Sequence, residues 1–314
     1  MRFKSIQRWE LLQAGAIAGS AALLAPSALA APKMRYDPDA KHELTIQEME
    51  YRRTAKGRAL LARIYQPSGP GPFPVILSLH GGAWNAKDRS AEDPFNRAIA
   101  AAGALVVAVD LTLAPEAPYP ACVRDASYAL RWLKARAKAW NGDAARIGVF
   151  GSSSGGHVAE LLALRPGDTR YNAIPLAEAP GLTASPAYVL TRSPISNTFA
   201  RFENARTRKV ESMVKNNQVF FVPWDTVHES NPQEILDRKE KVTFKPFLIM
   251  QGALDDNMLP ADQTRFVESY RAAGGVCDYT IFEGCPHEWV AQPGPQTERA
   301  HAMAKDFIAR QVNG

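Results

Sequence analysis

The chain has 314 residues, of which 46% are hydrophobic and 22% are charged, and its formal net charge is +5. This length and composition indicate a globular protein with one large domain or two small ones, and they exclude a disordered or fibrous chain. The net charge is too small to indicate nucleic acid as a partner.

The first thirty residues differ from the rest of the chain. Three basic residues precede a run of leucine and small residues between positions 11 and 24, and Ala28-Leu29-Ala30 follows this run. A basic start, a short apolar run and an A-x-A sequence are typical of a cleaved secretory signal. The run is broken by polar and glycine residues and is shorter than the ~20 residues of a membrane span. We therefore expect residues 1–30 to direct export to the periplasm or medium, with cleavage near Ala30 and no stable membrane span.

From residue 42 onwards, short apolar runs predict strands. Residues 42–53 and 59–65 have the alternation of an antiparallel pair, which we expect at one edge of a sheet. Runs rich in aliphatic residues predict buried central strands, and one more strand is expected near the C-terminus. The predicted central strands are 74–79, 104–109, 146–150, 187–191 and 246–250, and the additional strand is 277–282.

Helical patterns separate these strands. In the last pattern, Ala300, Ala304 and Phe307 belong to an apolar stripe that would pack one helix face on the sheet. Helices interleaved with strands are typical of an α/β fold with a mostly parallel sheet flanked by helices. We expect residues 31–314 to form a single domain of this class. The predicted helices are 94–102, 121–139, 156–164, 261–273 and 296–312.

One connection is much longer than the others. Residues 192–245 separate two central strands, whereas ordinary connections have about 4 to 6 residues. We interpret this segment as an inserted lid, which either forms a wall of the substrate pocket or is a small helical layer with its own core and a solvated basic face. Its aromatic and basic residues are Phe199, Phe202, Phe220, Phe221, Trp224, Arg201, Arg206, Arg208, Lys209 and Lys215.

The pattern G-x-S-x-G occurs between a predicted strand and a predicted helix. Gly151-Ser152-Ser153-Ser154-Gly155 directly follows the predicted strand 146–150 and precedes a predicted helix. This strand-turn-helix context is the one that a nucleophile elbow requires, with glycines where side chains would collide. The sequence therefore predicts Ser153 as a nucleophile.

A serine nucleophile needs a base, and the base needs a carboxylate, in the chain order serine, acid, histidine. His287 follows a predicted strand through a turn, whereas His301 falls inside the last predicted helix. The acid should follow the preceding strand, where Asp255 and Asp256 are adjacent. Neighbouring side chains on a turn point in different directions, so only one can face the imidazole. We favour Asp255 over Asp256, which could cap the turn or the following helix.

The run His80-Gly81-Gly82-Ala83-Trp84 follows the predicted strand 74–79. Its small residues allow the backbone to approach a substrate carbonyl, and its N–H groups could stabilise an oxyanion. Loss of one such donor typically costs about 3 to 4 kcal/mol of transition-state stabilisation. We expect this run to form the oxyanion hole.

With these four motifs in order, the chain resembles the α/β-hydrolases related to hormone-sensitive lipase, especially their compact carboxylesterase relatives with an HGG[GA]W run. The segments Leu113-Ala114-Pro115-Glu116 and Pro118-Tyr119-Pro120, together with Asp125, resemble the link between the glycine-rich strand and the nucleophile in that family. The resemblance covers roughly residue 60 to the C-terminus. It implies an α/β-hydrolase fold.

The resemblance also implies roles for individual residues. Two positions depart from the family pattern: Ala83 replaces a glycine and could narrow the acyl side of the pocket, and Ser154 replaces an alanine. His157 would be a packing residue at the start of a helix, within reach of the lid. The implied roles are Ser153 as nucleophile, Asp255 as acid, His287 as base, Gly82, Ala83 and the Ser154 N–H as the oxyanion hole, and His80 and Gly81 as its support.

Together the motifs and the resemblance predict hydrolysis of a small carboxylic ester through an acyl-enzyme. The aromatic residues of the lid favour an apolar substrate. The mechanism needs no metal and no organic cofactor, and Cys122, Cys277 and Cys285 lack metal-ligand spacing, so we expect buried thiols. The nearest alternative is an amidase, formamidase or peptidase-like hydrolase with the same triad. A non-catalytic binding protein on a hydrolase scaffold is the other class.

Overall fold

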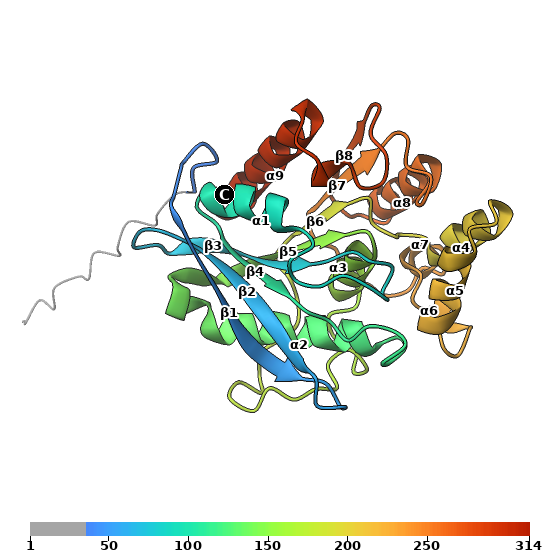
Figure 1. Ribbon diagram of the computed structural model, residues 1–314, viewed down its shortest axis with the longest axis horizontal. Coiled ribbons are helices and arrows are strands. Elements are labelled where there is room, and N and C mark those ends of the chain that lie inside the picture. The colour runs from blue at the N-terminus through green and yellow to red at the C-terminus, as the bar shows by residue number, and fades with distance from the viewer. Residues whose placement is uncertain (1–35) are drawn as a thin grey trace, which may run out of the picture. The chain divides into compact units, whose positions relative to one another are not determined.

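A computed structural model describes residues 36–314, so the predicted export signal at 1–30 lies outside the described residues. Eight strands form one sheet in the order β1-β2-β4-β3-β5-β6-β7-β8 (Figure 1). β1 pairs antiparallel with β2, and β2 with β4, while all other neighbours run parallel. The strands are β1 Leu44–Arg53, β2 Ala59–Pro67, β3 Phe73–Leu79, β4 Leu105–Val109, β5 Gly142–Ser152, β6 Val189–Arg192, β7 Phe247–Gly252 and β8 Cys277–Phe282. The mostly parallel sheet and its antiparallel edge pair are as predicted.

The observed strand bounds differ from the predicted ones by one or two residues in most strands, and the largest difference is in β5. β5 begins four residues before the predicted position 146, because Gly142 pairs with Phe73 in β3 although the residues between are polar or small. β6 begins at Val189 rather than at 187. Both differences lie at strand starts, where the apolar pattern is weakest.

The central strands are continuously apolar because both faces of the sheet are covered. In β3, Val75 and Leu77 belong to one hydrophobic cluster, whereas Ile76 belongs to the cluster on the opposite face. Successive side chains of a strand point to opposite faces, so a strand buried on both sides needs an apolar residue at every position. The two cores therefore confirm the reading of these runs as central strands.

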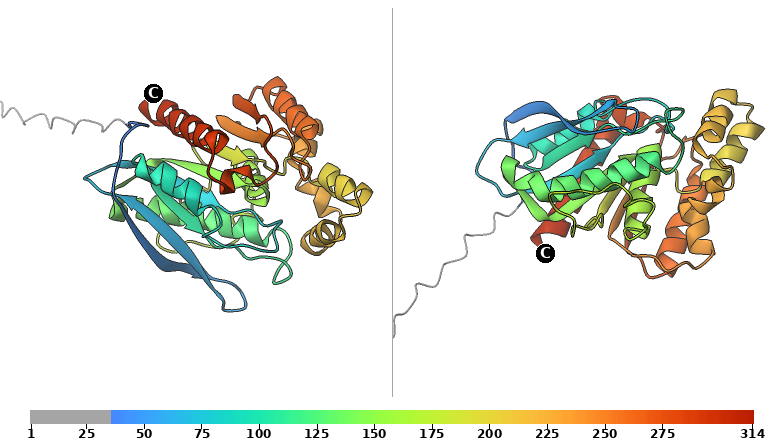
Figure 2. Two further views of the ribbon diagram at one scale, coloured as in Figure 1. Left: turned by 45° about the horizontal axis from the view of Figure 1, so that its top comes forward. Right: turned by 90° about the horizontal axis from the view of Figure 1, so that it is seen from below.

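The predicted helices are all present and cover the two faces of the sheet (Figure 2). α1 (Asp93–Ala101) and α9 (Pro295–Asn313) pack against one hydrophobic cluster. α2 (Ala121–Arg136), α3 (Ser154–Leu164) and α8 (Pro260–Ala272) pack against the other. α2 ends at Arg136 rather than at 139, and a 3-10 turn, Ala137–Trp140, continues it. None of the helices between residues 36 and 314 combines the length and apolar character that a membrane crossing requires.

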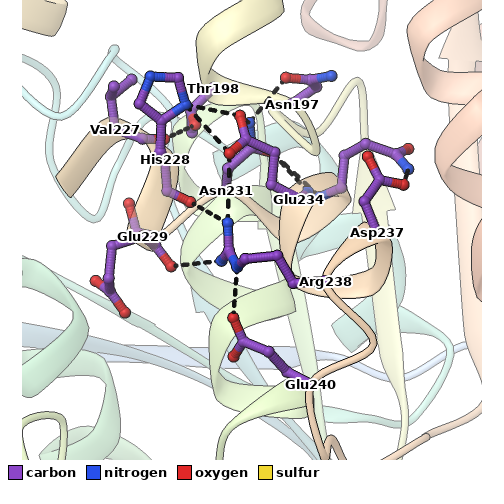
Figure 3. A network of polar contacts seen from close by, with 12 residues as sticks. Asn197, Thr198, Val227, His228, Glu229, Asn231, Glu234, Asp237, Arg238 and Glu240 are labelled. Atoms are coloured by element: carbon purple, nitrogen blue, oxygen red, sulfur yellow. Dashed lines mark hydrogen bonds and ion pairs between the residues drawn. The ribbon is translucent and has the colours of Figure 1, made fainter. Parts of the chain in front are cut away.

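The insertion, residues 192–245, consists of four helices between β6 and β7. Two of the four begin at asparagine caps: Asn197 Oδ1 accepts a hydrogen bond from Ala200 N at 3.0 Å, and Asn231 Oδ1 accepts one from Gln233 N at 3.1 Å. Asn231 Nδ2 also donates to Asn197 Oδ1 at 2.9 Å, which joins the two caps (Figure 3). The helices are α4 Thr198–Thr207, α5 Glu211–Phe220, α6 Thr226–Glu229 and α7 Pro232–Asp237.

Further polar contacts hold the short helices α6 and α7 together. His228 Nδ1 lies 2.9 Å from Glu234 Oε1, and Arg238 donates to the main-chain oxygen of His228 at 3.1 Å and to that of Glu229 at 3.4 Å (Figure 3). Helices this short leave many carbonyl groups without intrahelical partners. Side-chain donors from the same segment satisfy some of them, and these contacts join α6 to α7.

Candidate active site

Ser153 lies in the sharp turn between β5 and α3. Its backbone has φ 50° and ψ −116°, a strained conformation for a residue other than glycine. The flanking glycines are required by close contacts: a Cβ on Gly155 would lie 2.2 Å from Leu79 O, and one on Gly151 would lie 2.4 Å from Gly155 O. The N–H of Ser153 donates to Arg192 O at 2.9 Å, so β6 supports the turn. The elbow predicted from the sequence is present.

The structure brings Ser153, His287 and Asp255 together. His287 Nε2 lies 2.9 Å from Ser153 Oγ, and His287 Nδ1 lies 2.8 Å from Asp255 Oδ2. An ionised carboxylate only accepts hydrogen bonds, so Nδ1 carries the proton and Nε2 is left to accept from the Ser153 hydroxyl. This tautomer is the one in which an imidazole can remove a proton from serine.

Asp255 is almost fully buried, with 2% of its surface exposed. Its Oδ1 accepts hydrogen bonds from Asn257 N at 3.0 Å and Met258 N at 2.9 Å, and its Oδ2 accepts one from Gln251 Nε2 at 2.9 Å. Burial by itself would raise the pKa of this carboxyl, but the contact with His287 and the Met258 N–H outweigh burial and lower the pKa. Asp255 is therefore ionised at neutral pH and can hold a charged imidazole.

Asp256 points away from His287. Its side chain is 67% exposed and forms an ion pair with Arg208 of the insertion. The two adjacent carboxylates thus have separate surroundings, and only Asp255 contacts the histidine.

The glycine-rich run lies beside the elbow. A Cβ on Gly81 would lie 3.3 Å from Ser153 Cβ, so the backbone of this run passes close to the serine. Gly82 has φ 106°, and a Cβ there would lie 2.1 Å from Ala86 O. Ala83 also has a left-handed φ of 51°. These conformations form a tight turn, in which Gly82 O accepts hydrogen bonds from two following N–H groups at 3.0 Å.

The remaining predicted members of the oxyanion site occupy defined places. Ser154 is the first residue of α3, where main-chain N–H groups have no partner one turn earlier in the helix. His80 is buried, and its Nδ1 lies 2.7 Å from Gly81 O, a contact that stabilises the glycine-rich run. Burial lowers the pKa of His80 despite this hydrogen bond, so the ring is neutral at pH 7.

His157 joins three segments that surround the site. Its Nδ1 accepts a hydrogen bond from Trp84 Nε1 at 3.2 Å, and its Nε2 donates to Ser230 O at 2.8 Å. Burial lowers the pKa of His157 to about 4, so the ring is neutral and can both accept and donate. The sequence indicated packing and a contact with the insertion, and the structure contains both.

The insertion packs closely on Trp84 of the glycine-rich run. Phe220 stacks on Trp84 with ring centroids 4.6 Å apart and planes at 3°, and Phe221 meets Trp84 edge-on at 5.1 Å. Arg201 does not belong to a solvated basic face, because it is 1% exposed and its guanidinium lies over the Trp84 ring at 5.4 Å. Its Nε donates to Asn257 Oδ1 at 2.7 Å. The basic residues of the insertion therefore do not all face solvent.

Sequence reasoning missed Arg192, the last residue of β6. Its NH1 donates to the main-chain oxygen of His287 at 2.5 Å, and its NH2 donates to Ser152 Oγ. The available signal was a charged residue directly after the predicted central strand 187–191. The cysteines are free and buried, as expected.

Two residues of the link between the glycine-rich run and the nucleophile, Tyr119 and Asp125, form polar contacts with other parts of the chain. Asp125 is buried, accepts a hydrogen bond from Thr112 N at 2.6 Å and forms an ion pair with Arg52. The Tyr119 hydroxyl donates to Glu229 Oε2 at 2.8 Å, which connects this link to the insertion. These residues therefore stabilise the surroundings of the site.

Comparisons with known proteins agree with this architecture. Carboxylesterase NlhH of Mycobacterium tuberculosis is 45% identical over 92 residues, which cover 29% of this chain and 29% of that protein. The AB hydrolase superfamily protein C1039.03 of Schizosaccharomyces pombe is 29% identical over 78% of this chain and 72% of its own length. The match with NlhH thus spans less than a third of either protein.

Solved structures share the fold at low sequence identity. The hyperthermophilic esterase of Pyrobaculum calidifontis has a TM-score of 0.68 and 22% identity, and the match covers 87% of both chains. Esterase B of Lactobacillus rhamnosis has a TM-score of 0.70 and 18% identity, covering 88% of this chain and 89% of that one. A family model described as the alpha/beta hydrolase fold matches residues 76–291. With most of its sheet and the whole predicted site inside that match, the chain belongs to the α/β-hydrolase fold family.

Proposed function

We propose that this protein hydrolyses small carboxylic esters, with Ser153 as nucleophile, His287 as general base and Asp255 as the carboxylate that orients His287. The observation that carries the proposal is the continuous hydrogen-bonded line from Ser153 Oγ through both ring nitrogens of His287 to Asp255. The carboxylesterase and esterase names of the relatives support the same chemistry.

The first half of the reaction forms an acyl-enzyme. Ser153 Oγ attacks the ester carbonyl while its proton moves to His287 Nε2, and the N–H groups of Gly82, Ala83 and Ser154 stabilise the oxyanion. Collapse breaks the carbon–oxygen bond to the alcohol, which leaves with the proton that His287 returns. Asp255 stays ionised throughout and stabilises the imidazolium.

The second half regenerates the serine. A water molecule gives its proton to His287 Nε2 and attacks the acyl carbon. Collapse of this second intermediate breaks the bond to Ser153 Oγ, which takes the proton back from His287 and releases the carboxylic acid. The same groups serve both halves, so one arrangement of side chains accounts for the whole cycle.

A set of p-nitrophenyl esters of graded acyl length, together with matching anilides, tests the reaction. We expect ester turnover that falls by about 10⁴-fold or more in Ser153→Ala with an unchanged thermal midpoint, because the nucleophile is lost and the fold is not. A fluorophosphonate should label wild type but not the variant. Retained ester turnover in Ser153→Ala would contradict the proposal, and anilide turnover without ester turnover would favour amide hydrolysis.

We also propose that residues 1–30 direct export and are removed near Ala30. The basic start, the short apolar run and the A-x-A sequence support this proposal. Expression of the whole chain in a bacterium, followed by cell fractionation and N-terminal sequencing, tests it. A periplasmic or extracellular product that begins near residue 31 is expected, and an unprocessed cytoplasmic product would contradict it.

A further inference from the structure

Arg192 lies where three parts of the candidate site meet. It ends β6, opposite Ser152 of β5 and opposite Met250 of β7 in the sheet register. Its main-chain oxygen accepts the N–H of Ser153 at 2.9 Å. Through its backbone alone, this residue already supports the turn that carries the nucleophile.

The side chain of Arg192 adds contacts to the histidine loop and to the elbow. NH1 donates to the main-chain oxygen of His287 at 2.5 Å, and NH2 donates to the hydroxyl of Ser152, the residue before the nucleophile. NH2 also lies 3.6 Å from Glu92 Oε2. One guanidinium therefore bridges two loops that are 134 residues apart at Ser153 and His287.

This arrangement places a charge inside the protein. The side chains of Arg192 and Glu92 are 4% and 8% exposed. A buried ion pair is often no more stabilising than apolar residues of the same volume. What the guanidinium provides, and an apolar side chain does not, is a planar fork of donors with fixed directions. The guanidinium thus connects two loops at a position that an apolar side chain of similar volume could also fill.

We propose that Arg192 is a positioning residue that fixes His287 and the nucleophile elbow relative to each other. This inference rests on the proposed function of Ser153 and His287. The guanidinium acts through the main chain of His287 and the side chain of Ser152, not through contact with the reacting atoms. Without it, the main chain of His287 would lose a contact that helps to set the position of the imidazole against Ser153 Oγ.

A contact on the exposed side of the same loop is not equivalent. Lys87 Nζ lies 2.5 Å from Glu288 Oε1, but these side chains are 38% and 58% exposed. Solvent competes with an ion pair of this kind, so it contributes little to the position of the loop. Arg192, in contrast, contacts the main chain of His287 from the buried side of the loop.

The test uses the whole protein with two substitutions of Arg192. Arg192→Lys keeps the charge beside Glu92 but replaces the fork by a point donor, which cannot serve both loops with the same geometry. Arg192→Met is combined with Glu92→Gln, so that no buried carboxylate is left unpaired. Steady-state kinetics on p-nitrophenyl acetate, the rate of fluorophosphonate labelling and thermal midpoints are measured for each.

Arg131 offers a matched control in α2. It is 5% exposed and its NH2 donates to the main-chain oxygen of Ile174 at 2.7 Å, so it too is a buried arginine that binds a carbonyl. The hydrogen bonds of its guanidinium within the described part of the chain go to Ser127 O and Ile174 O, which are not residues of the candidate site. Arg131→Met should lower the thermal midpoint while kcat and the labelling rate stay at wild-type values.

We expect both Arg192 variants to lower kcat and the labelling rate by about 10²-fold with little change in KM, because displacement of a catalytic group by about 1 Å has this effect. The proton NMR signal of His287 Nδ1–H should also shift or broaden. Wild-type kcat in a folded Arg192 variant would overturn the proposal. So would an equal loss of kcat in Arg131→Met.

The labelling rate separates this inference from the proposed ester chemistry. If wild type is labelled at Ser153 but turns over no ester, the ester proposal fails. The comparison of labelling rates then decides on Arg192 alone: a slower rate in both Arg192 variants supports the inference, and an unchanged rate refutes it.

Discussion

At the scale of single residues, two adjacent carboxylates have opposite surroundings. Asp255 is buried and contacts His287, whereas Asp256 is exposed and pairs with Arg208. A carboxylate that accepts several hydrogen bonds in a buried place is held in one orientation. An exposed ion pair contributes little, because water screens it. The structural difference predicts a large functional difference between neighbouring residues.

Asp255→Asn should lower kcat by about 10⁴-fold, because the amide favours the wrong imidazole tautomer and no longer stabilises the imidazolium. Asp256→Asn makes the same chemical change one residue later and should leave kcat within about twofold of wild type. Steady-state ester kinetics of the two variants check this prediction. Equal losses in both variants would contradict it.

At the scale of elements, α4 of the insertion contacts the loop that carries the acid. Two side chains of α4 and that of its C-cap, Arg208, are spaced by three and four residues and so lie on one side of the helix. Asn204 Nδ2 donates to Asp256 O at 2.8 Å, Arg208 donates to the same oxygen, and Arg201 Nε donates to Asn257 Oδ1 at 2.7 Å. The helix therefore holds the residues that directly follow Asp255.

The double substitution Asn204→Ala with Arg208→Ala should lower kcat by about tenfold, because it releases the main chain next to Asp255 and allows the carboxylate to shift. Arg206→Ala is a control on the same helix, since Arg206 is 66% exposed and, within residues 36–314, forms an ion pair only with Glu203 of that helix. Ester kinetics and thermal midpoints measure both. A loss in the control as large as that in the double variant would show that the effect is not specific to this side of α4.

At the scale of the whole molecule, a buried acid connects the domain core to the insertion. Glu160 of α3 is fully buried, and its Oε1 accepts a hydrogen bond from Ser196 Oγ at 2.7 Å. Ser196 also receives a hydrogen bond from Gln263 Nε2 of α8 at 3.0 Å. Burial raises the pKa of Glu160 to about 8, against the opposing effect of Ser196. The folded protein therefore keeps this side chain protonated at neutral pH.

This raised pKa gives the stability a defined pH dependence. Between its ordinary value of 4.5 and about 8, Glu160 is ionised in the unfolded chain and protonated in the fold. The folded state binds more protons, so the free energy of unfolding falls as pH rises through this window. A side chain that cannot titrate would remove this contribution.

The thermal midpoint of Glu160→Gln, measured relative to that of wild type, should therefore be higher at pH 9 than at pH 5. A gain of at least about 1 kcal/mol corresponds to about 2 to 4 °C. Glu268→Gln on the exposed side of α8 is the control and should change the midpoint little at either pH. Differential scanning calorimetry at the two pH values measures the effect, and identical pH profiles for wild type and Glu160→Gln would refute it.

The sequence predicted most of the fold because the strand and helix patterns are local. Continuous apolar runs mark strands buried on both faces, and all five predicted helices are present within a few residues. The start of β5 was missed because its first residues pair with β3 without being apolar. The sequence pattern did not predict the four helices of the insertion separately. Their apolar residues pack both within the insertion and against the glycine-rich run, so no single helical stripe is visible.

By itself, the sequence determined the α/β class, the elbow at Ser153, the glycine-rich run and the chain order of serine, acid and histidine, because each depends on residues close together in the chain. The tertiary structure alone decided which of two aspartates contacts His287, that Arg201 is buried, and that Arg192 bridges Ser152 and His287. These features depend on contacts between segments far apart in sequence. Their geometry follows from how the strands and the insertion pack, which no local pattern encodes.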